Sequence, residues 1–156
     1  HINVGSPHEP DQLTQLGEVT GEAERLGMPV LAMAYARGPD IDESDPEALG
    51  HAVRLAEEVG ADVIKTGYSG DAENFERVAA AASKPVLIAG GSRGTDRETL
   101  AMVRGAMDGG AAGISMGRSI FQHEDPEAIT RAVGAVVHDD ASVDRAAEQA
   151  GIAVDF

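Results

Sequence analysis

The chain has 156 residues, enough for one domain with a substantial core but not for two. Hydrophobic residues make up 42% of it and aromatic residues only 3%, so the core has to be aliphatic. The absence of cysteine excludes disulfides and thiolate chemistry. Asp and Glu number 27 against 12 Lys and Arg, which gives a formal net charge of −15. A field of this sign repels nucleic acid and anionic membranes, so we expect neither as a partner.

The sequence also predicts where the protein works. No apolar run approaches the length of a membrane span, and no charged-then-apolar leader opens the sequence, so we expect a soluble, cytoplasmic protein. Only two of the basic residues are lysines, and the others are arginines. This balance, together with the acidic surface, is typical of proteins from a high-salt cytoplasm, where screening weakens self-repulsion. An ordinary acidic protein is the alternative.

Five short apolar runs, bounded by glycine or proline, alternate with stretches of helical periodicity. The expected strands, each buried on both faces of a parallel sheet, are residues 1–4, 29–34, 61–66, 85–89 and 112–116. The expected helices are residues 10–26, 45–59, 71–82, 95–108 and about 125–137, with a C-terminal helical tail at about 141–156. Thr95 and Glu98 have the spacing of a capping box, and Gly27 and Gly60 follow the last turns of two helices.

The repeated strand–helix unit predicts a parallel α/β fold, for which two architectures compete. A dinucleotide-binding sheet requires G-x-G-x-x-G after its first strand, and none stands there. The loops that begin at Gly90 and Gly117 instead have the pattern of a barrel phosphate site. We therefore expect a (β/α)₈ TIM barrel, with residues 1–156 as a single domain that covers roughly its C-terminal five βα units. A complete five-stranded open sheet is the alternative.

The partial-barrel interpretation has a consequence for the isolated chain. About three βα units are expected to precede residue 1, so the first and last of the five strands would expose unpaired edges. We therefore expect the 156-residue chain alone to fold poorly and to be inactive.

Lys65 is the strongest chemical signal, because it lies in the apolar strand Ala-Asp-Val-Ile-Lys-Thr, near its C-terminal end. Barrel enzymes place their reactive groups at that end of the strands. Removing a lysine ammonium from water favours the neutral amine, which can attack a carbonyl carbon and form a Schiff base. The alternative is a structural lysine that pairs with a carboxylate such as Asp62 or extends to the rim.

Tyr35 ends the preceding strand, so its phenol and the Lys65 amine are expected to face one pocket. A Schiff-base aldolase moves a proton onto or off a hydroxyl oxygen next to the carbon–carbon bond that breaks, and a positioned phenol can do this. A rim tyrosine with a packing role is the alternative. Tyr68, in the glycine-rich loop after Lys65, is the rival for proton transfer, although its position favours a rim or lid residue.

Two glycine-rich loops follow successive strands and predict an oxyanion site. They are Gly90-Gly91-Ser92 and Gly117-Arg118-Ser119. Glycines let backbone N–H groups approach a phosphate closely, and the guanidinium of Arg118 can bind it in a forked geometry. Arg37 is expected to reach the substrate from the neighbouring loop.

No metal site or cofactor is expected. The five histidines have no zinc-like spacing, and His123 with its acidic neighbours is more typical of a helix start. The carboxylates of residues 40–45 and the Asp139–Asp140 pair are interpreted as solvated acidic surface. An iminium withdraws electrons as a metal Lewis acid would, so the expected chemistry needs no ion.

Five segments resemble the archaeal class I aldolases and occur in the same order. They are HINVGS, LAMAYARG, VIKTGYSGD, IAGGS and MGRSIFQH, and the likeness extends to about residue 143. The resemblance implies a (β/α)₈ barrel that assembles as a ring of identical subunits. It also implies that Lys65 is the Schiff-base lysine and that Tyr35 is the proton donor. The residues implied to contact the substrate and its phosphate are Arg37, Gly90, Gly91, Gly117 and Arg118.

The chain departs from the family at two places. Tyr-Ala-Arg-Gly replaces the frequent Tyr-Pro-Arg-Gly, which keeps both functional side chains. The Asp-His-Gly motif of the family's first strand, which supplies an acid/base aspartate, does not occur in these 156 residues. This second departure bears on the activity of the isolated chain rather than on the family to which it is similar.

Together, the residues and the resemblance predict a metal-independent Schiff-base aldol enzyme that acts on a phosphorylated ketose. The resemblance implies transfer of a three-carbon unit from a 6-deoxy-5-ketofructose phosphate to aspartate semialdehyde, a step towards 3-dehydroquinate and the aromatic amino acids. Class I fructose-bisphosphate aldolase, which would use the same groups, is the first alternative. A non-catalytic, phosphate-binding α/β module is the second.

Overall fold

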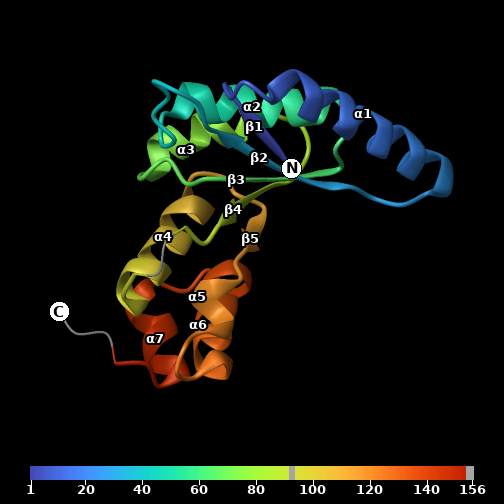
Figure 1. Ribbon diagram of the computed structural model, residues 1–156. Helices are drawn as coiled ribbons and strands as arrows, with labels where there is room; N and C mark the ends of the chain where they lie inside the picture. Colours follow the sequence, from blue (N-terminus) through green and yellow to red (C-terminus); the bar gives the residue numbers. More distant parts are fainter. Residues whose placement is uncertain (92–93, 154–156) are drawn as a thin grey trace.

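A computed structural model describes residues 1–91 and 94–153, in which short strands alternate with helices (Figure 1). The strands are β1 (Ile2–Val4), β2 (Leu31–Ala36), β3 (Val63–Thr66), β4 (Val86–Ala89) and β5 (Gly113–Ser115). The helices are α1 (Glu9–Leu26), α2 (Pro46–Glu58), α3 (Ala72–Ala79), α4 (Asp96–Asp108), α5 (Arg118–Phe121), α6 (Pro126–Asp139) and α7 (Val143–Ala150). None of the helices in the described residues is both long enough and apolar enough to span a bilayer.

The sheet is parallel throughout, and its strands lie in the order β1-β2-β3-β4-β5. This order follows the sequence, whereas a doubly wound sheet reverses its direction at a switch point. In Figure 1, α1, α2 and α3 lie on one side of the strands, while α4, α6 and α7 pack together beyond β4 and β5. A sheet that winds in one direction, with its helices following in the same order, has the arrangement of a barrel wall.

Side chains alternate between the two faces of this sheet. On β2, Ala32 and Ala34 are buried against the helices, whereas Leu31 and Met33 are 46% and 38% exposed. The expectation that the strands are buried on both faces is therefore wrong for the described residues. The face turned away from the helices, which we call the inner face, is half-open because no described element covers it.

Helix packing divides the apolar core into two clusters. The first lies between the strands and α1 to α3, and Phe75 and Ile64 are completely buried in it. The second is formed by α4, α6 and α7, where Leu100 and Ile129 are buried among alanines. The small side chains let the helices approach closely, which compensates for the scarcity of aromatic residues.

The helix ends follow the expected signals. Thr95 and Glu98 form a complete capping box at the start of α4, and Asp45 caps α2 with its carboxylate. Gly27 ends α1 in the left-handed conformation, with φ of 66°. α5 was not expected from the sequence, while α7 lies inside the range expected for the C-terminal helical tail, whose last three residues lie outside the described part.

The loop between β2 and α2 is anchored to the loop after β1. Gly38 packs directly on the Gly5 carbonyl group, and Ile41 lies against both glycines. The Arg37 backbone N–H donates a hydrogen bond of 2.8 Å to the Val4 carbonyl oxygen. A side chain at residue 38 would therefore displace backbone rather than a mobile side chain.

We expect Gly38→Ala to lower the free energy of unfolding by about 2–3 kcal/mol, because its methyl group has no space beside Gly5. Gly134→Ala is the matched control, since this α6 glycine has no neighbour within 4 Å of the added carbon. The control should raise the free energy of unfolding by about 0.5–1 kcal/mol through helix propensity. Denaturant titration of the gene product that contains residues 1–156 measures both, and equal effects would contradict the packing described for the β2–α2 loop.

Candidate active site

A pocket of about 750 Å³ lies at the C-terminal ends of β2 to β5. It contains every residue that the sequence predicted for the site. These are Lys65, Tyr35, Arg37, Gly90, Gly91, Gly117 and Arg118. The parallel sheet brings them together because all four strands end at the same edge.

Lys65 is held on the inner face by the alternation of β3. Its neighbours Ile64 and Thr66 are completely buried on the helix side, so Lys65 points to the pocket, where it is half-buried. Within the described residues, the Lys65 side chain makes no hydrogen bond or ion pair. A lysine amine with no carboxylate partner is available to react with a ligand.

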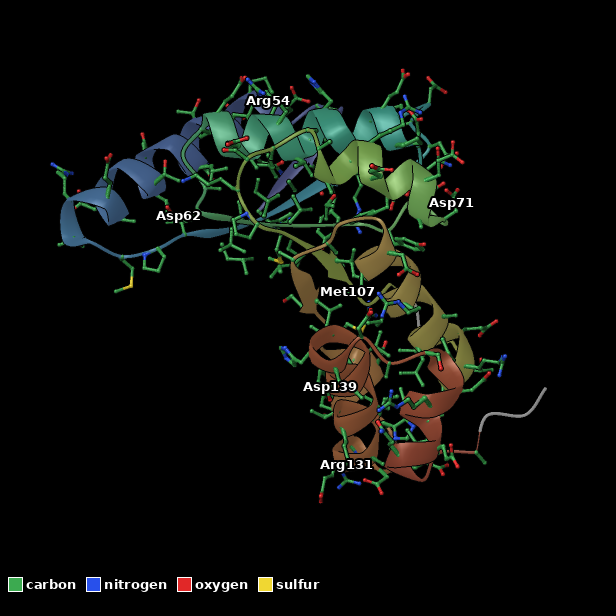
Figure 2. The ribbon with its side chains drawn as sticks, turned by 180° about the vertical axis from the view of Figure 1, so that it is seen from behind. Arg54, Asp62, Asp71, Met107, Arg131 and Asp139 are labelled. Atoms are coloured by element: carbon green, nitrogen blue, oxygen red, sulfur yellow. The ribbon has the colours of Figure 1, made fainter. Side chains whose placement is uncertain are left out.

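Asp62, the carboxylate that could have paired with Lys65, lies elsewhere. Its Oδ2 accepts a hydrogen bond of 2.9 Å from the Val30 backbone N–H. Asp62 precedes β3 and Asp71 follows it, and Figure 2 shows these two residues at opposite ends of the sheet. Lys84 lines a different pocket together with Asp62. The two lysines of the chain therefore lie at opposite ends of the strands.

Tyr35 lies on the inner face of β2, beside the strand that carries Lys65. The guanidinium carbon of Arg37 is 4.5 Å from the centroid of the Tyr35 ring, a cation–π arrangement. Arg37 Nε also contacts Glu43 Oε2 at 3.3 Å. The orientation of the Tyr35 ring is thus coupled to an ion pair in the β2–α2 loop.

Tyr68 lines the same pocket but is fixed by packing against helices. Its ring centroid is 5.5 Å from that of Phe75, and its hydroxyl lies against Gly105 of α4. Burial raises the pKa of the Tyr68 phenol, and the nearby charges of Asp71 and Asp108 raise it further. Tyr68 is therefore a partly buried packing residue in the pocket wall, and it is less suited than Tyr35 to exchange a proton.

The two glycine loops lie side by side in the pocket. A Cβ on Gly90 would be 3.1 Å from Met116 Cγ and 3.3 Å from Ser119 Oγ, so glycine allows this close approach. Gly91 has φ of 59°, a conformation that favours glycine. Arg118 is exposed, and its guanidinium has no ion pair or hydrogen bond with any described residue. Ser92, which the sequence placed in the first loop, lies outside the described residues.

The structure adds residues to the pocket that the sequence did not indicate. Asp42 and Glu43 are exposed, in agreement with the solvated acidic surface expected for residues 40–45, and both also line the pocket at its rim. Ser44 donates two hydrogen bonds to Asp42, from its hydroxyl and its backbone N–H, and they hold the pKa of the Asp42 carboxyl below its ordinary value. Further lining residues are Ser44, Gly67, Met102, Ser115, Ser119 and Phe121.

The histidines take no part in this pocket. His123 Nε2 lies 3.0 Å from Asp96 Oδ1, and its Nδ1 lies 2.8 Å from the Asp125 carbonyl oxygen. His123 thus joins the start of α6 to the start of α4, in agreement with a helix start. In the described part of the chain, no group of three His, Asp or Glu side chains is arranged to hold a metal ion.

Comparison with curated proteins identifies relatives along almost the whole chain. Over 155 residues it is 64% identical to 2-amino-3,7-dideoxy-D-threo-hept-6-ulosonate synthase of Halobacterium salinarum, a match that covers 99% of this chain and 58% of that protein. It is 39% identical over 155 residues to 2-amino-4,5-dihydroxy-6-oxo-7-(phosphonooxy)heptanoate synthase of Streptomyces griseus, with 98% and 57% covered. The chain thus spans somewhat over half the length of these relatives.

A solved structure and a family model agree with these matches. The structure is that of an archaeal fructose-1,6-bisphosphate aldolase with its catalytic lysine covalently bound to a carbinolamine intermediate. It has a TM-score of 0.83 and 32% identity, over 87% of this chain and 55% of that one. The predicted fold class is confirmed, since the chain covers part of the barrel of such aldolases. The model of the DeoC/LacD family aldolases matches residues 1–123, and the chain belongs to this family.

Proposed function

We propose that the protein containing this chain is a Schiff-base aldol enzyme of the transaldolase type, with a phosphorylated ketose as donor. The observation that carries the proposal is the position of Lys65, which faces the pocket and has no ionic partner in the described residues. A free amine at the end of a barrel strand, beside a phenol and an anion site, has the groups that this chemistry requires.

Lys65 and Tyr35 have separate roles in this proposal. The Lys65 amine adds to the ketone carbon of the donor, and the Tyr35 phenol donates a proton to the departing hydroxyl, so water leaves and an iminium and a Tyr35 phenolate remain. Tyr35 accepts the proton of the hydroxyl next to the breaking carbon–carbon bond, the first aldehyde leaves, and the electron pair remains as an enamine. The enamine carbon then attacks the acceptor aldehyde, whose oxygen takes the proton back from Tyr35. Addition of water to the iminium releases the new ketose and restores the Lys65 amine, and the proton set free returns to the Tyr35 phenolate.

Arg118 and the glycine loops are proposed to bind the phosphate of the substrate. The Arg118 guanidinium is exposed and unpaired among the described residues, and Gly90, Gly91 and Gly117 lie beside it in the pocket. Backbone groups at such glycines can approach phosphate oxygens closely, while the guanidinium supplies the charge. The chain as a whole is strongly acidic and repels anions, so a local cluster of this kind is needed to bind one.

Aspartate semialdehyde is proposed as the acceptor. The products in the names of the Halobacterium salinarum and Streptomyces griseus relatives are both seven-carbon 2-amino acids with a ketone at C6. An aldol addition that forms the bond between C4 and C5 would take the first four carbons, with the amino acid group, from this aldehyde. We further propose that the protein is cytoplasmic and forms a homo-oligomer, and the exposed apolar side chains of Leu26 and Met28 support the oligomer.

Fructose-bisphosphate aldolase is the second candidate function. The similarity to a solved archaeal aldolase of that specificity favours it, at 32% identity. Both functions use a lysine Schiff base, so the pocket around Lys65 serves either. Assays of the gene product that contains residues 1–156 with 6-deoxy-5-ketofructose phosphate plus aspartate semialdehyde, and with fructose 1,6-bisphosphate, separate the two. Faster turnover of the bisphosphate would overturn the first proposal in favour of the second.

We expect Lys65→Arg to abolish activity, with a loss of at least about 10⁴-fold in kcat, because an arginine cannot form the Schiff base. Lys84→Arg is the matched control at the other end of the sheet and should retain activity within about twofold. Steady-state kinetics with the ketose phosphate measure both. Substantial turnover by Lys65→Arg would rule out a Schiff base at this residue, and no turnover by the unmodified protein would favour a non-catalytic module.

We expect Tyr35→Phe to lower kcat by about 10²- to 10⁴-fold with little change in KM, because it removes the proton-transfer group but keeps the ring under Arg37. Tyr68→Phe should lower kcat less than tenfold, since the Tyr68 hydroxyl is packed against α4. The same kinetic assay compares the two variants. A larger loss in Tyr68→Phe would assign the proton transfer to Tyr68 instead.

A further inference from the structure

The pocket carries its charges unevenly. Arg118 lies in the loop after β5, and Lys65 lies on β3 near the middle of the site. The β2–α2 loop forms the other side, where Asp42 and Glu43 line the rim together with Arg37. The side formed by the loop after β5 thus offers the Arg118 guanidinium to an anion. The side formed by the β2–α2 loop offers two carboxylates as well as the Arg37 guanidinium.

Arg37 is already engaged in two interactions. Its Nε contacts Glu43 Oε2 at 3.3 Å, and its guanidinium carbon is 4.5 Å from the Tyr35 ring centroid. Asp42 lines the same rim, where Ser44 donates two hydrogen bonds to its carboxylate and lowers the pKa of that carboxyl. A second phosphate group entering this side would meet two carboxylates and a guanidinium that is partly neutralised. This side of the pocket therefore disfavours a bisphosphate.

A zwitterion matches the same side of the pocket. The carboxylate of an amino acid can pair with the remaining N–H groups of Arg37, and its ammonium can pair with Glu43. We propose that Arg37 and Glu43 form the subsite that binds the amino acid group of the acceptor aldehyde, with Glu43 as the residue that selects the ammonium. This inference rests on the proposed function and adds to it the residues that determine acceptor specificity.

The subsite does not alter the atoms that react. The aldehyde carbon of the acceptor forms the new bond with the enamine carbon held on Lys65, and its oxygen takes the proton from Tyr35. The ammonium and the carboxylate only orient the aldehyde. Because the guanidinium also covers the Tyr35 ring, a bound acceptor would fix the proton donor at the same time.

The test compares two acceptors that differ only in the amino group, aspartate semialdehyde and succinate semialdehyde, with 6-deoxy-5-ketofructose phosphate as donor. For the gene product that contains residues 1–156, we expect kcat/KM to be about 10- to 100-fold higher for aspartate semialdehyde. In Glu43→Gln this preference should fall to less than about threefold, mainly through a higher KM for aspartate semialdehyde. The KM for succinate semialdehyde should change much less, because it has no ammonium to lose.

Glu47→Gln is the matched control, since Glu47 is an exposed carboxylate on α2 that pairs with Arg77 outside the pocket. It should keep the preference of the unmodified protein. An unchanged preference in Glu43→Gln, or none in the unmodified protein, would overturn the subsite. Preferential use of glyceraldehyde 3-phosphate as acceptor would also overturn the subsite, but it would be compatible with a Schiff base at Lys65. If the protein turned over no ketose phosphate at all, the proposed function itself would fail.

Discussion

The alternation of side chains along β3 is the constraint on which the site depends. Ile64 and Thr66 are completely buried against the helices, so the strand cannot rotate without exposing Ile64. Lys65 is therefore fixed on the inner face, in the pocket rather than among the helices. A shift of one residue in the pairing of β3 with β2 would exchange the two faces and remove the amine from the pocket. Helix packing far from the pocket thus determines where the lysine points.

The β2–α2 loop supplies the acidic side of the pocket and the ion pair between Arg37 and Glu43. It is held by the contact of Gly38 with Gly5 and by the bond from Arg37 N–H to Val4. The same loop presents Glu43 to Arg37, and Arg37 covers the ring of Tyr35. In the proposed function, proton transfer by Tyr35 and binding of the acceptor are therefore linked through the Arg37–Glu43 ion pair. By contrast, the side proposed to bind phosphate is formed by Gly90, Gly91, Gly117 and Arg118, which lie outside this loop.

Much of this arrangement could be predicted from the sequence, because it depends on residues that are close together in the chain. Glycine and proline bound the strands, and Thr95 with Glu98 marks a helix start that the structure reproduces. Lys65 stands near the C-terminal end of an apolar run, and parallel strands end at a common edge of the sheet. The sequence therefore also predicted that Lys65 lies at the edge where the pocket is found. The resemblance to class I aldolases supplied the expected roles, and the family it suggested is confirmed.

Other features depend on contacts that no periodic pattern encodes. Glu43 reaches Arg37 only because the loop between them folds back, and the residues themselves read as acidic surface. The half-open inner face was missed for a related reason: apolar runs such as that of β2 look buried on both sides, although Leu31 and Met33 are partly exposed. α5 is a single short helix after Gly117, too short to show a helical period.

Reductive trapping tests the central claim most directly. The gene product that contains residues 1–156 is incubated with 6-deoxy-5-ketofructose phosphate and sodium borohydride, digested, and analysed by peptide mass spectrometry. An iminium on Lys65 would be reduced to a stable secondary amine, so the account predicts added mass on the peptide that contains Lys65 and none on the peptide that contains Lys84. Labelling of Lys84, or of neither lysine in a protein that turns over the ketose, would contradict the account.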